Sequence, residues 1–264
     1  MASSPRIISL LTDFGTQDGF VGIMKGVILG INPSVFIVDL SHEVPPQDIL
    51  TGALILRSAV AFFPPATIHV AVIDPGVGSN RRAILVETAT ALLVGPDNGV
   101  LSLAAPLDSI QRIIHLTNRQ YFLPNVSLTF HGRDVFAPVA AHVSRGISLE
   151  EFGPSVASME RLTLPHVERD TAKMAGRIIV IDRFGNLVTN ITATDLLPFP
   201  TERLSVSIGP VQIHGLASTY ASVPIGAVTA LINSWGLLEI AVRNGSAAQQ
   251  LGVQRGSLVI VTHA

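Results

Sequence analysis

The chain contains no cysteine among its 264 residues. Disulfide bonds, zinc sites built on thiolates and a cysteine nucleophile are therefore all excluded. Charged residues are also scarce, at 14%, whereas hydrophobic residues make up 48%. This balance argues against disorder, and it predicts that some surface is hidden in an oligomer, because an isolated monomer would normally carry more charge.

Other features are missing as well. The formal net charge is only −2 and no lysine-rich stretch occurs, which argues against a nucleic-acid partner. Arg57 interrupts the longest apolar run, near residues 52–64, which is too short to span a membrane. Residues 1–6 lack the basic and apolar regions of a signal peptide. We therefore expect a soluble, cytoplasmic protein with neither a membrane nor a nucleic acid as partner.

Strand and helix patterns alternate over the first part of the chain. Helices are expected at residues 17–31, 47–62 and 134–143, and strands at 6–11, 35–40, 68–73, 82–87, 91–94 and 109–116. Alternation at this spacing predicts right-handed βαβ units and a mostly parallel sheet. The N-terminal part is therefore predicted to be a Rossmann-like α/β domain.

The pattern changes after Gly153 and Pro154, where a polar segment runs to about residue 173. Short strands dominate beyond it, with one helical stretch at 246–251; the strands are expected at 177–182, 187–191, 204–208, 211–213, 227–233, 237–242 and 257–261. Regular turns between short strands predict a small β-barrel or sandwich. The predicted organisation is an α/β domain at residues 1–160, a linker at 161–173 and a β domain at 174–264.

Asp74 directly follows the apolar run 68–73, which is typical of a central parallel strand. In open α/β sheets, ligands bind at the carboxyl ends of the strands. Pro75 and two nearby glycines allow a sharp turn, so Asp74 and Arg81 can share one small space. A purely structural loop with surface arginines explains this stretch equally well.

Asp13 and His131 also lie at the ends of expected elements. Asp13 follows the first strand, where it is suited either to capping the next helix or to accepting hydrogen bonds from two vicinal ribose hydroxyls. His131 precedes the third helix, for which Asp134 is a plausible N-cap. The other histidines have no such setting and are interpreted as surface or packing residues: His42, His69, His115, His142, His166, His214 and His263.

Established signature motifs are absent. No P-loop, Gly-x-Ser-x-Gly elbow or His-Glu-x-x-His motif occurs, and Arg81 stands where a dinucleotide motif beginning at Gly76 needs its third glycine. Asp97 and Asn98 are interpreted as turn formers in preference to ligand contacts. No set of acidic residues and histidines has metal-ligand spacing, so no metal is expected.

Five short motifs occur in order along nearly the whole chain: Thr12-Asp13-Phe14-Gly15, Asp74-Pro-Gly-Val-Gly-x-x-Arg81, Phe130-His131-Gly132-Arg133-Asp134, Asp182-Arg183-Phe184-Gly185-Asn186 and Asn233-Ser234. Together they resemble the S-adenosyl-L-methionine (SAM) hydroxide adenosyltransferases, the SAM hydrolases related to fluorinating and chlorinating enzymes. The resemblance implies a C-terminal β-barrel and a homotrimer, with SAM bound between one subunit's N-terminal domain and its neighbour's C-terminal domain. It also implies hydrolysis of SAM to adenosine and L-methionine, by water or hydroxide attacking the ribose C5′, without a cofactor.

The resemblance also assigns roles to residues. The family's water-handling Asp, Arg and His fall on Asp74, Arg81 and His131, since the seven-residue spacing selects Arg81 over Arg82. Other positions match substrate-binding residues: Asp13, Phe14, Asp182, Phe184, Asn186, Ser234, Arg243 and Asn244. Trp235 stands at a variable place, which leaves its contact open.

Two alternative functions remain at this stage. A SAM-dependent halogenase would use the same pocket with halide as the nucleophile, but the fluorinating relatives carry other residues at the three water-handling positions and a Ser in place of Gly132. A non-catalytic SAM or adenosine sensor would keep Asp13, Phe184 and Asn186, but it would not need Arg81 or His131.

Overall fold

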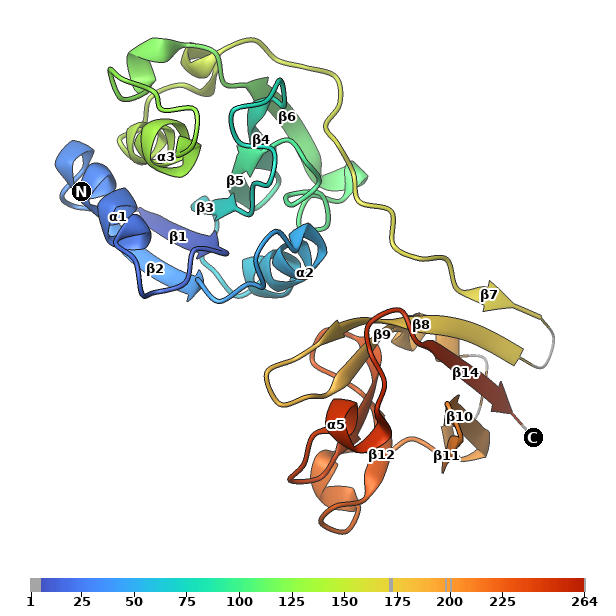
Figure 1. Cartoon of the computed structure of the whole chain (residues 1–264). Helices are drawn as coiled ribbons and strands as arrows, with labels where there is room; N and C mark the ends of the chain where they lie inside the picture. Colours follow the sequence, from blue (N-terminus) through green and yellow to red (C-terminus); the bar gives the residue numbers. More distant parts are fainter. Residues whose placement is uncertain (1–5, 171–172, 198, 200, 264) are drawn as a thin grey trace. The chain divides into compact units, whose positions relative to one another are not determined.

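The computed structural model describes residues 6–170, 173–197, 199 and 201–263. The chain divides into two compact units, Met1–Leu162 and Thr163–Ala264, called here the N-terminal and C-terminal units (Figure 1). Within the described residues, no helix has both the length and the apolar character needed to cross a membrane.

A six-stranded sheet forms the centre of the N-terminal unit, in the order β2-β1-β3-β5-β4-β6. Its strands are β1 (Ile7–Thr12), β2 (Phe36–Ser41), β3 (Thr67–Val72), β4 (Ala83–Thr88), β5 (Ala91–Pro96) and β6 (Ile110–His115). Strands β2, β1, β3 and β5 run parallel to one another, which confirms the predicted mostly parallel sheet. Strand β4 is antiparallel to both neighbours, because only Ala89 and Thr90 separate it from β5 and so short a link makes a hairpin.

Helices cover both faces of this sheet (Figure 1). Helices α1 (Phe20–Ile31) and α3 (Ala137–Ser144) contribute to the apolar cluster on one face, whereas α2 (Ile49–Val60) contributes to the cluster on the other. Every residue of β3 and β5 is buried, as expected for strands covered on both sides. Both α1 and α2 begin later than predicted, and the Asp48 side chain fixes the start of α2 by accepting from Thr51 N.

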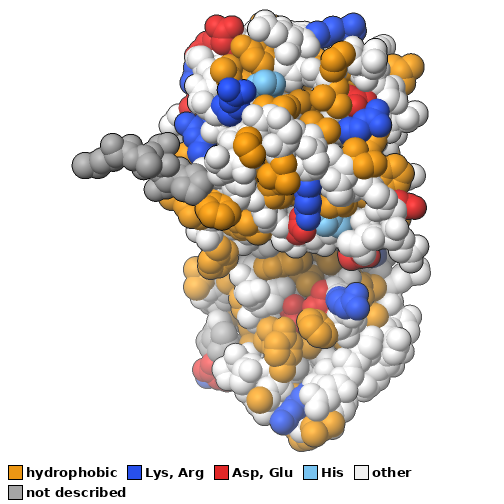
Figure 2. All heavy atoms as spheres, turned by 90° about the vertical axis from the view of Figure 1, so that its left-hand side faces the viewer, with side chains coloured by type: hydrophobic (Ala, Val, Ile, Leu, Met, Phe, Trp, Pro, Cys, Tyr) orange, Lys and Arg blue, Asp and Glu red, His pale blue; other side chains and the backbone are white. Residues whose placement is uncertain are grey.

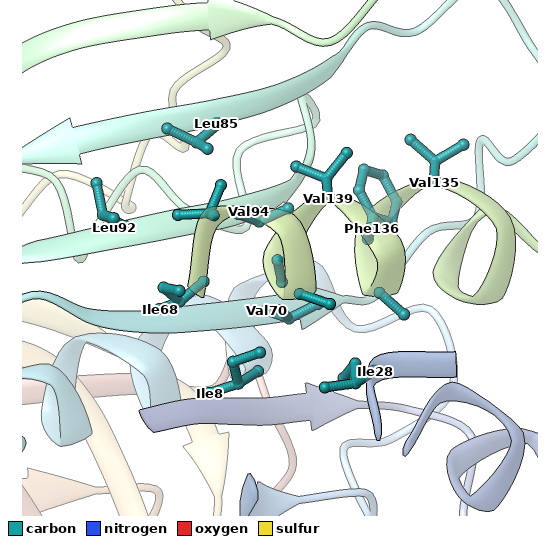
Figure 3. Close-up of a cluster of buried hydrophobic side chains, with 14 of the residues drawn as sticks. Ile8, Ile28, Ile68, Val70, Leu85, Leu92, Val94, Val135, Phe136 and Val139 are labelled. Carbon is teal, nitrogen blue, oxygen red and sulfur yellow. The ribbon is translucent and has the colours of Figure 1, made fainter. Parts of the chain in front are cut away.

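The larger cluster is drawn in Figure 3, where side chains from neighbouring strands meet those of the helices. Ile8, Ile68 and Val94 lie on strands, and Ile28 and Phe136 approach them from helical segments. Phe136 and Ile8 are completely buried. This packing holds the sheet edge that carries the predicted site in a fixed position relative to α3.

A single π-helical segment, Gly132–Phe136, runs directly into α3. The prediction that Asp134 caps this helix is wrong, because Asp134 lies inside the π-helical segment and is fully buried. Its carboxylate instead accepts from Ser127 N at 2.8 Å and pairs with Arg133. Single π-helical turns are frequently found at functional sites. Three 3-10 helices complete the described part of the unit: Leu107–Ser109, Arg119–Tyr121 and Leu149–Phe152.

The C-terminal unit is an antiparallel sheet in the order β11-β10-β14-β8-β9-β13-β12, with β7 paired to β8. Its strands are β7 (Glu168–Arg169), β8 (Lys173–Ile181), β9 (Leu187–Thr192), β10 (Leu204–Ile208), β11 (Val211–His214), β12 (Val228–Ile232), β13 (Leu237–Val242) and β14 (Leu258–His263). The end strands β11 and β12 contact each other, so the sheet nearly closes into the predicted barrel. Helical segments connect the strands: α4 (Ala193–Leu196), α5 (Ala247–Leu251), Thr201–Arg203 and Tyr220–Ser222.

Several large apolar side chains are exposed on the N-terminal unit. They include Phe20, Ile23 and Leu29 on α1, and Phe36 on the edge strand β2. On the face shown in Figure 2, apolar side chains lie between scattered charged ones. Exposed apolar surface of this kind is characteristic of sites that associate with another molecule.

Candidate active site

Asp74 lies in the loop that leaves the carboxyl end of β3. The loop approaches a second segment closely, because a Cβ atom at Gly78 would collide with the carbonyl oxygen of Leu128. Gly78 also has a φ of +78°, a conformation that glycine adopts without strain. The loop therefore brings Asp74 and Arg81 against the segment that leads to His131.

Asp74, Arg81 and His131 form one hydrogen-bonded chain, referred to below as the trio. Arg81 Nε donates to Asp74 Oδ1 at 2.8 Å, and Arg81 Nη2 contacts both Asp74 Oδ2 and His131 Nδ1, the latter at 2.8 Å. The side chains of Asp74 and Arg81 are only 4% and 9% exposed. Arg81 is therefore not a surface arginine. A bidentate, desolvated pair of this kind has a fixed geometry.

The Arg81 contact determines which nitrogen of His131 carries a proton. A guanidinium can only donate, so His131 Nδ1 must accept, and the proton of the neutral ring lies on Nε2. Burial and then the Arg81 charge lower the pKa of His131, against the opposing effects of Asp74 and Asp134. His131 is therefore held as a neutral ring with one N–H group free to donate.

Asp13 lies at the same sheet edge as Asp74. Strands β1 and β3 are parallel neighbours with Thr12 opposite Val72, so the residues that follow them leave on the same side. Of the two roles left open for Asp13, helix capping is excluded, because α1 begins after Gly19 and has no side-chain cap. The Asp13 carboxylate instead accepts from Gln47 N at 2.8 Å.

Aromatic side chains lie beside the trio. The Phe14 ring packs edge-on against Phe20 and Phe130, each with 5.9 Å between centroids. A Cβ atom at the buried Gly132 would lie 3.4 Å from both Phe14 and Phe130, and 3.2 Å from Met24 Sδ. Gly132 thus lets these side chains close over the start of the π-helical segment.

Asp97 and Asn98 both have partners within the protein, and those of Asn98 fit its interpretation as a turn former. Asp97 receives a hydrogen bond from Arg82 at 2.7 Å and another from Glu160 N. The Asn98 side chain donates to Ile73 O and accepts from Val100 N. In the described residues, no group of three or more His, Asp or Glu side chains is arranged to hold a metal ion.

The C-terminal unit contains a pocket of about 580 Å³. All six substrate-binding positions predicted in this unit line it: Asp182, Phe184, Asn186, Ser234, Arg243 and Asn244. Trp235, whose contact was left open, also lines it. These positions are far apart in sequence, and the barrel brings them into one cavity.

Two pocket residues owe their position to local hydrogen bonds. Asp182 Oδ1 accepts from the backbone N–H groups of Phe184 and Asn186, both at 2.9 Å, which shapes the turn after β8. The Phe184 ring is left 75% exposed at the pocket. Arg243 Nη1 donates to the carbonyl oxygens of Ala221 and Val223.

Sequence reasoning missed Glu239, which is 3% exposed and lines the same pocket. Its carboxylate accepts from Tyr220 Oη at 2.7 Å and from Asn233 Nδ2 at 3.0 Å. Burial, and then the hydrogen bond to Glu239, raises the pKa of Tyr220 well above its ordinary value. A charged residue inside the otherwise apolar strand β13 was the available signal, because buried carboxylates need partners.

Comparison with known families accounts for most of the chain. Residues 8–153 match the SAM hydroxide adenosyltransferase N-terminal domain, and residues 176–260 match the C-terminal domain of the same family. The chain belongs to the SAM hydroxide adenosyltransferase family. The resemblance indicated by the five sequence motifs is thereby confirmed.

Several relatives are similar over nearly their full length. An (R)-S-adenosyl-L-methionine hydrolase of Salinispora tropica is 40% identical, covering 99% of each chain, and one of Thermus thermophilus is 37% identical over 95% of this chain and 97% of its own. A fluorinase of Actinoplanes is more distant, at 27% identity over 100% of this chain and 99% of its own. The structure of an uncharacterized conserved protein from Thermotoga maritima matches 97% of this chain and 100% of its own, with a TM-score of 0.89 and 37% identity.

Proposed function

We propose that this protein hydrolyses SAM to adenosine and L-methionine. The observation that carries the proposal is the trio, a hydrogen-bonded chain from Asp74 through Arg81 to His131, in a protein 40% identical over its full length to an (R)-SAM hydrolase. Because that relative's name specifies the R configuration, we propose the R epimer at sulfur as the preferred substrate.

The proposed reaction is displacement at the ribose C5′. An oxygen nucleophile forms the new C5′–O bond as the C5′–S bond breaks, and the electron pair stays on sulfur. Methionine leaves as a neutral thioether, so no general acid is needed. One water is consumed and one proton is released for each SAM. The enzyme must position and partly desolvate the nucleophile in line with the breaking bond.

Within this proposal, Arg81 and His131 act on the oxygen nucleophile. The Arg81 charge favours hydroxide over water, and the His131 Nε2–H group is available to donate a hydrogen bond to that oxygen. His131 Nδ1 is already occupied, which argues against His131 as the proton acceptor and in favour of loss of the proton to solvent. Asp74 fixes the guanidinium through two contacts.

Asp13 is proposed to hold the ribose hydroxyls, with Phe14 packing beside them. A carboxylate offers about four acceptor sites, and in the described part of the chain Gln47 N occupies one of those of Asp13. Sites therefore remain on Asp13 for two vicinal hydroxyls. The pocket of the C-terminal unit is proposed to take adenine and methionine, through Phe184, Asn186 and Ser234 and the other predicted positions in its lining.

We also propose that the chain assembles as a homotrimer in which SAM contacts the N-terminal unit of one subunit and the C-terminal unit of another. Two observations support this assembly. The proposed substrate groups are divided between the two units, and apolar side chains such as Phe20 and Phe36 are exposed on α1 and on the edge strand β2. The expected cytoplasmic location belongs to the same proposal.

A halogenase is disfavoured by the same trio. A halide carries no proton and needs no Asp–Arg–His chain to activate it. The fluorinase relatives are also more distant, at 24% to 27% identity, than the hydrolase relatives.

The test is a reaction in ¹⁸O-labelled water, with chloride present and with each SAM epimer supplied separately. Mass analysis should find the label on the 5′-hydroxyl of adenosine and none on methionine. Free adenine as the main product would indicate cleavage at C1′, and 5′-chloro-5′-deoxyadenosine would indicate a halogenase. Either product would overturn the proposal. Equal rates with both epimers would overturn only the proposed R preference.

A further inference from the structure

A polar chain, buried at one end, links the carboxyl ends of β1 and β2, and the proposed mechanism does not use it. Thr12 Oγ1 lies 2.8 Å from His42 Nδ1, and His42 Nε2 lies 2.9 Å from Asp39 Oδ1. Lys25 Nζ donates to Asp39 Oδ2 at 2.6 Å. Thr12 is completely buried and His42 is 5% exposed, whereas the Asp39 side chain is 43% exposed. His42 was predicted to be a surface or packing residue, and these specific partners show that its role is more than packing.

The direction of each hydrogen bond in this chain follows from the groups involved. The ionised Asp39 carboxylate can only accept, so His42 Nε2 must donate to it. In the neutral ring, Nδ1 then accepts the single hydroxyl proton of Thr12. The Thr12 oxygen keeps its lone pairs and accepts from Phe14 N at 3.3 Å. Every polar atom of the chain is therefore satisfied by a neutral His42.

The order hydroxyl, imidazole, carboxylate is that of a nucleophilic triad, but this Thr is not a nucleophile. Its side chain has no exposed surface, so a substrate cannot reach the hydroxyl oxygen. The function of the chain must therefore lie in what it holds in place.

His42 holds the segment Thr12–Gly15 at both ends. Its ring binds Thr12, and its carbonyl oxygen accepts from Gly15 N at 2.7 Å. Gly15 has a φ of +66°, so the segment turns sharply at that point. The pairing of β1 with β2 shifts register between Leu10 and Leu11, directly before this segment. Regular pairing with β3 ends at Thr12, so strand pairing does not fix the residues beyond it, and the contacts of His42 help to do so.

We propose that His42 is a positioning residue for the ribose subsite. By fixing Thr12 and Gly15, it sets the position of the Asp13 carboxylate that lies between them, so that both oxygens present acceptor sites to the cis-diol of a nucleoside. This inference rests on the ribose role proposed for Asp13. Asp13 is the group that contacts the ligand, and His42 acts only through the backbone that carries it.

The experiment uses calorimetry on the full chain with two ligands, adenosine and 2′,3′-dideoxyadenosine, which lacks both hydroxyls. The variant His42→Ala should lose about tenfold or more in adenosine affinity, the equivalent of one well-formed hydrogen bond to a charged group. Its affinity for the dideoxy ligand should stay at the wild-type value. In turnover with SAM, KM should rise while kcat is retained. His142→Ala is the matched control, because His142 is half-buried in the same unit and packs on Tyr121.

A double-mutant cycle with Asp13→Ala makes the test specific. If His42 acts through Asp13, adding His42→Ala to Asp13→Ala should cause no further loss of adenosine affinity. Equal losses for both ligands, or additive losses in the cycle, would show a general structural role and overturn the inference. Unchanged adenosine affinity in His42→Ala would also overturn it.

A second variant keeps the test valid if His42→Ala does not fold. Asp39→Ala changes a half-exposed side chain and removes the partner of both His42 Nε2 and Lys25, so it should weaken adenosine binding several-fold and leave dideoxyadenosine binding unchanged. If Asp39→Ala does not lose adenosine affinity selectively, the inference is overturned. Failure of the proposed function gives a different result: wild-type protein would then bind both ligands equally, and Asp13→Ala would have no effect.

Discussion

Arg81 Nη2 lies 2.8 Å from His131 Nδ1, and this contact fixes the hydrogen-bonding role of the histidine. Since a guanidinium has no acceptor, His131 presents its remaining N–H group outward from Nε2. The arrangement is suited to holding an oxygen nucleophile beside a permanent positive charge. It is poorly suited to removing a proton, because the basic nitrogen is already occupied.

We predict that Arg81→Ala reduces kcat by about 100-fold or more, as expected when a preorganised charge at the reacting atom is removed. Adenosine binding should remain detectable, because Arg81 is assigned to the nucleophile and not to the nucleoside. Arg82→Ala is the matched control, since the neighbouring Arg82 pairs with Asp97 and lies outside the trio. Steady-state kinetics and calorimetry on both variants check this. Near-normal turnover in Arg81→Ala would remove Arg81 from the mechanism.

The acid limb of the activity profile should report on His131. Burial and the Arg81 charge lower its pKa, so the ring stays neutral at neutral pH and gains a proton only below the ordinary histidine range near ~6.5. Protonation would place a hydrogen on Nδ1 facing the Arg81 N–H group, and the contact would break. We therefore expect kcat/KM to fall with decreasing pH around a midpoint below that range. In His131→Gln the acid limb should be absent, and an unchanged limb would assign it to another group.

The sequence predicted those parts of the site that depend on local pattern. The apolar run before Asp74 and the proline and glycines after it were sufficient to place that carboxylate at a strand end, with Arg81 nearby. The partners of Asp13 and His42 were not predictable in this way, because Gln47 and Thr12 lie 34 and 30 residues away from them. The local pattern therefore left both a helix cap and a ribose contact open for Asp13. Such contacts depend on how parallel strands are placed side by side, which a local pattern does not contain.

The same limit applies to strand direction. The pattern located β4 as a strand, but its antiparallel direction follows from the two-residue connection to β5, which alternation alone did not identify. Strand β7 was missed because it has only two residues, Glu168 and Arg169, and both are exposed. An apolar pattern can appear only where a strand buries one of its faces.

Acid should destabilise the N-terminal unit through His69. This ring is completely buried, and burial lowers its pKa to about 4. In the unfolded chain the pKa of this histidine is about 6.5. Below that pH the unfolded chain binds a proton that the folded chain does not, so the free energy of unfolding falls as pH decreases toward 4. The loss should reach about 3 kcal/mol across this window. Denaturant unfolding at several pH values, compared between wild type and His69→Leu, measures it. If the free energy of unfolding of the variant falls as steeply with decreasing pH, His69 is excluded as the cause.

The last prediction concerns Glu239, whose buried carboxylate accepts from Tyr220 Oη and Asn233 Nδ2. Glu239→Ala leaves both donors without a partner and should destabilise the C-terminal unit by about 2 to 5 kcal/mol. Glu239→Gln should cost much less, because its amide oxygen can accept from Asn233 while its NH₂ group donates to the phenol oxygen. The same change removes the negative charge that opposes ionisation of Tyr220, so the pKa of Tyr220 should fall toward its ordinary value. Only one other tyrosine, Tyr121, is present, so an absorbance titration can resolve the shift. An unchanged titration, together with equal stability of the Ala and Gln variants, would show that the Tyr220–Glu239 hydrogen bond contributes nothing to the folded unit.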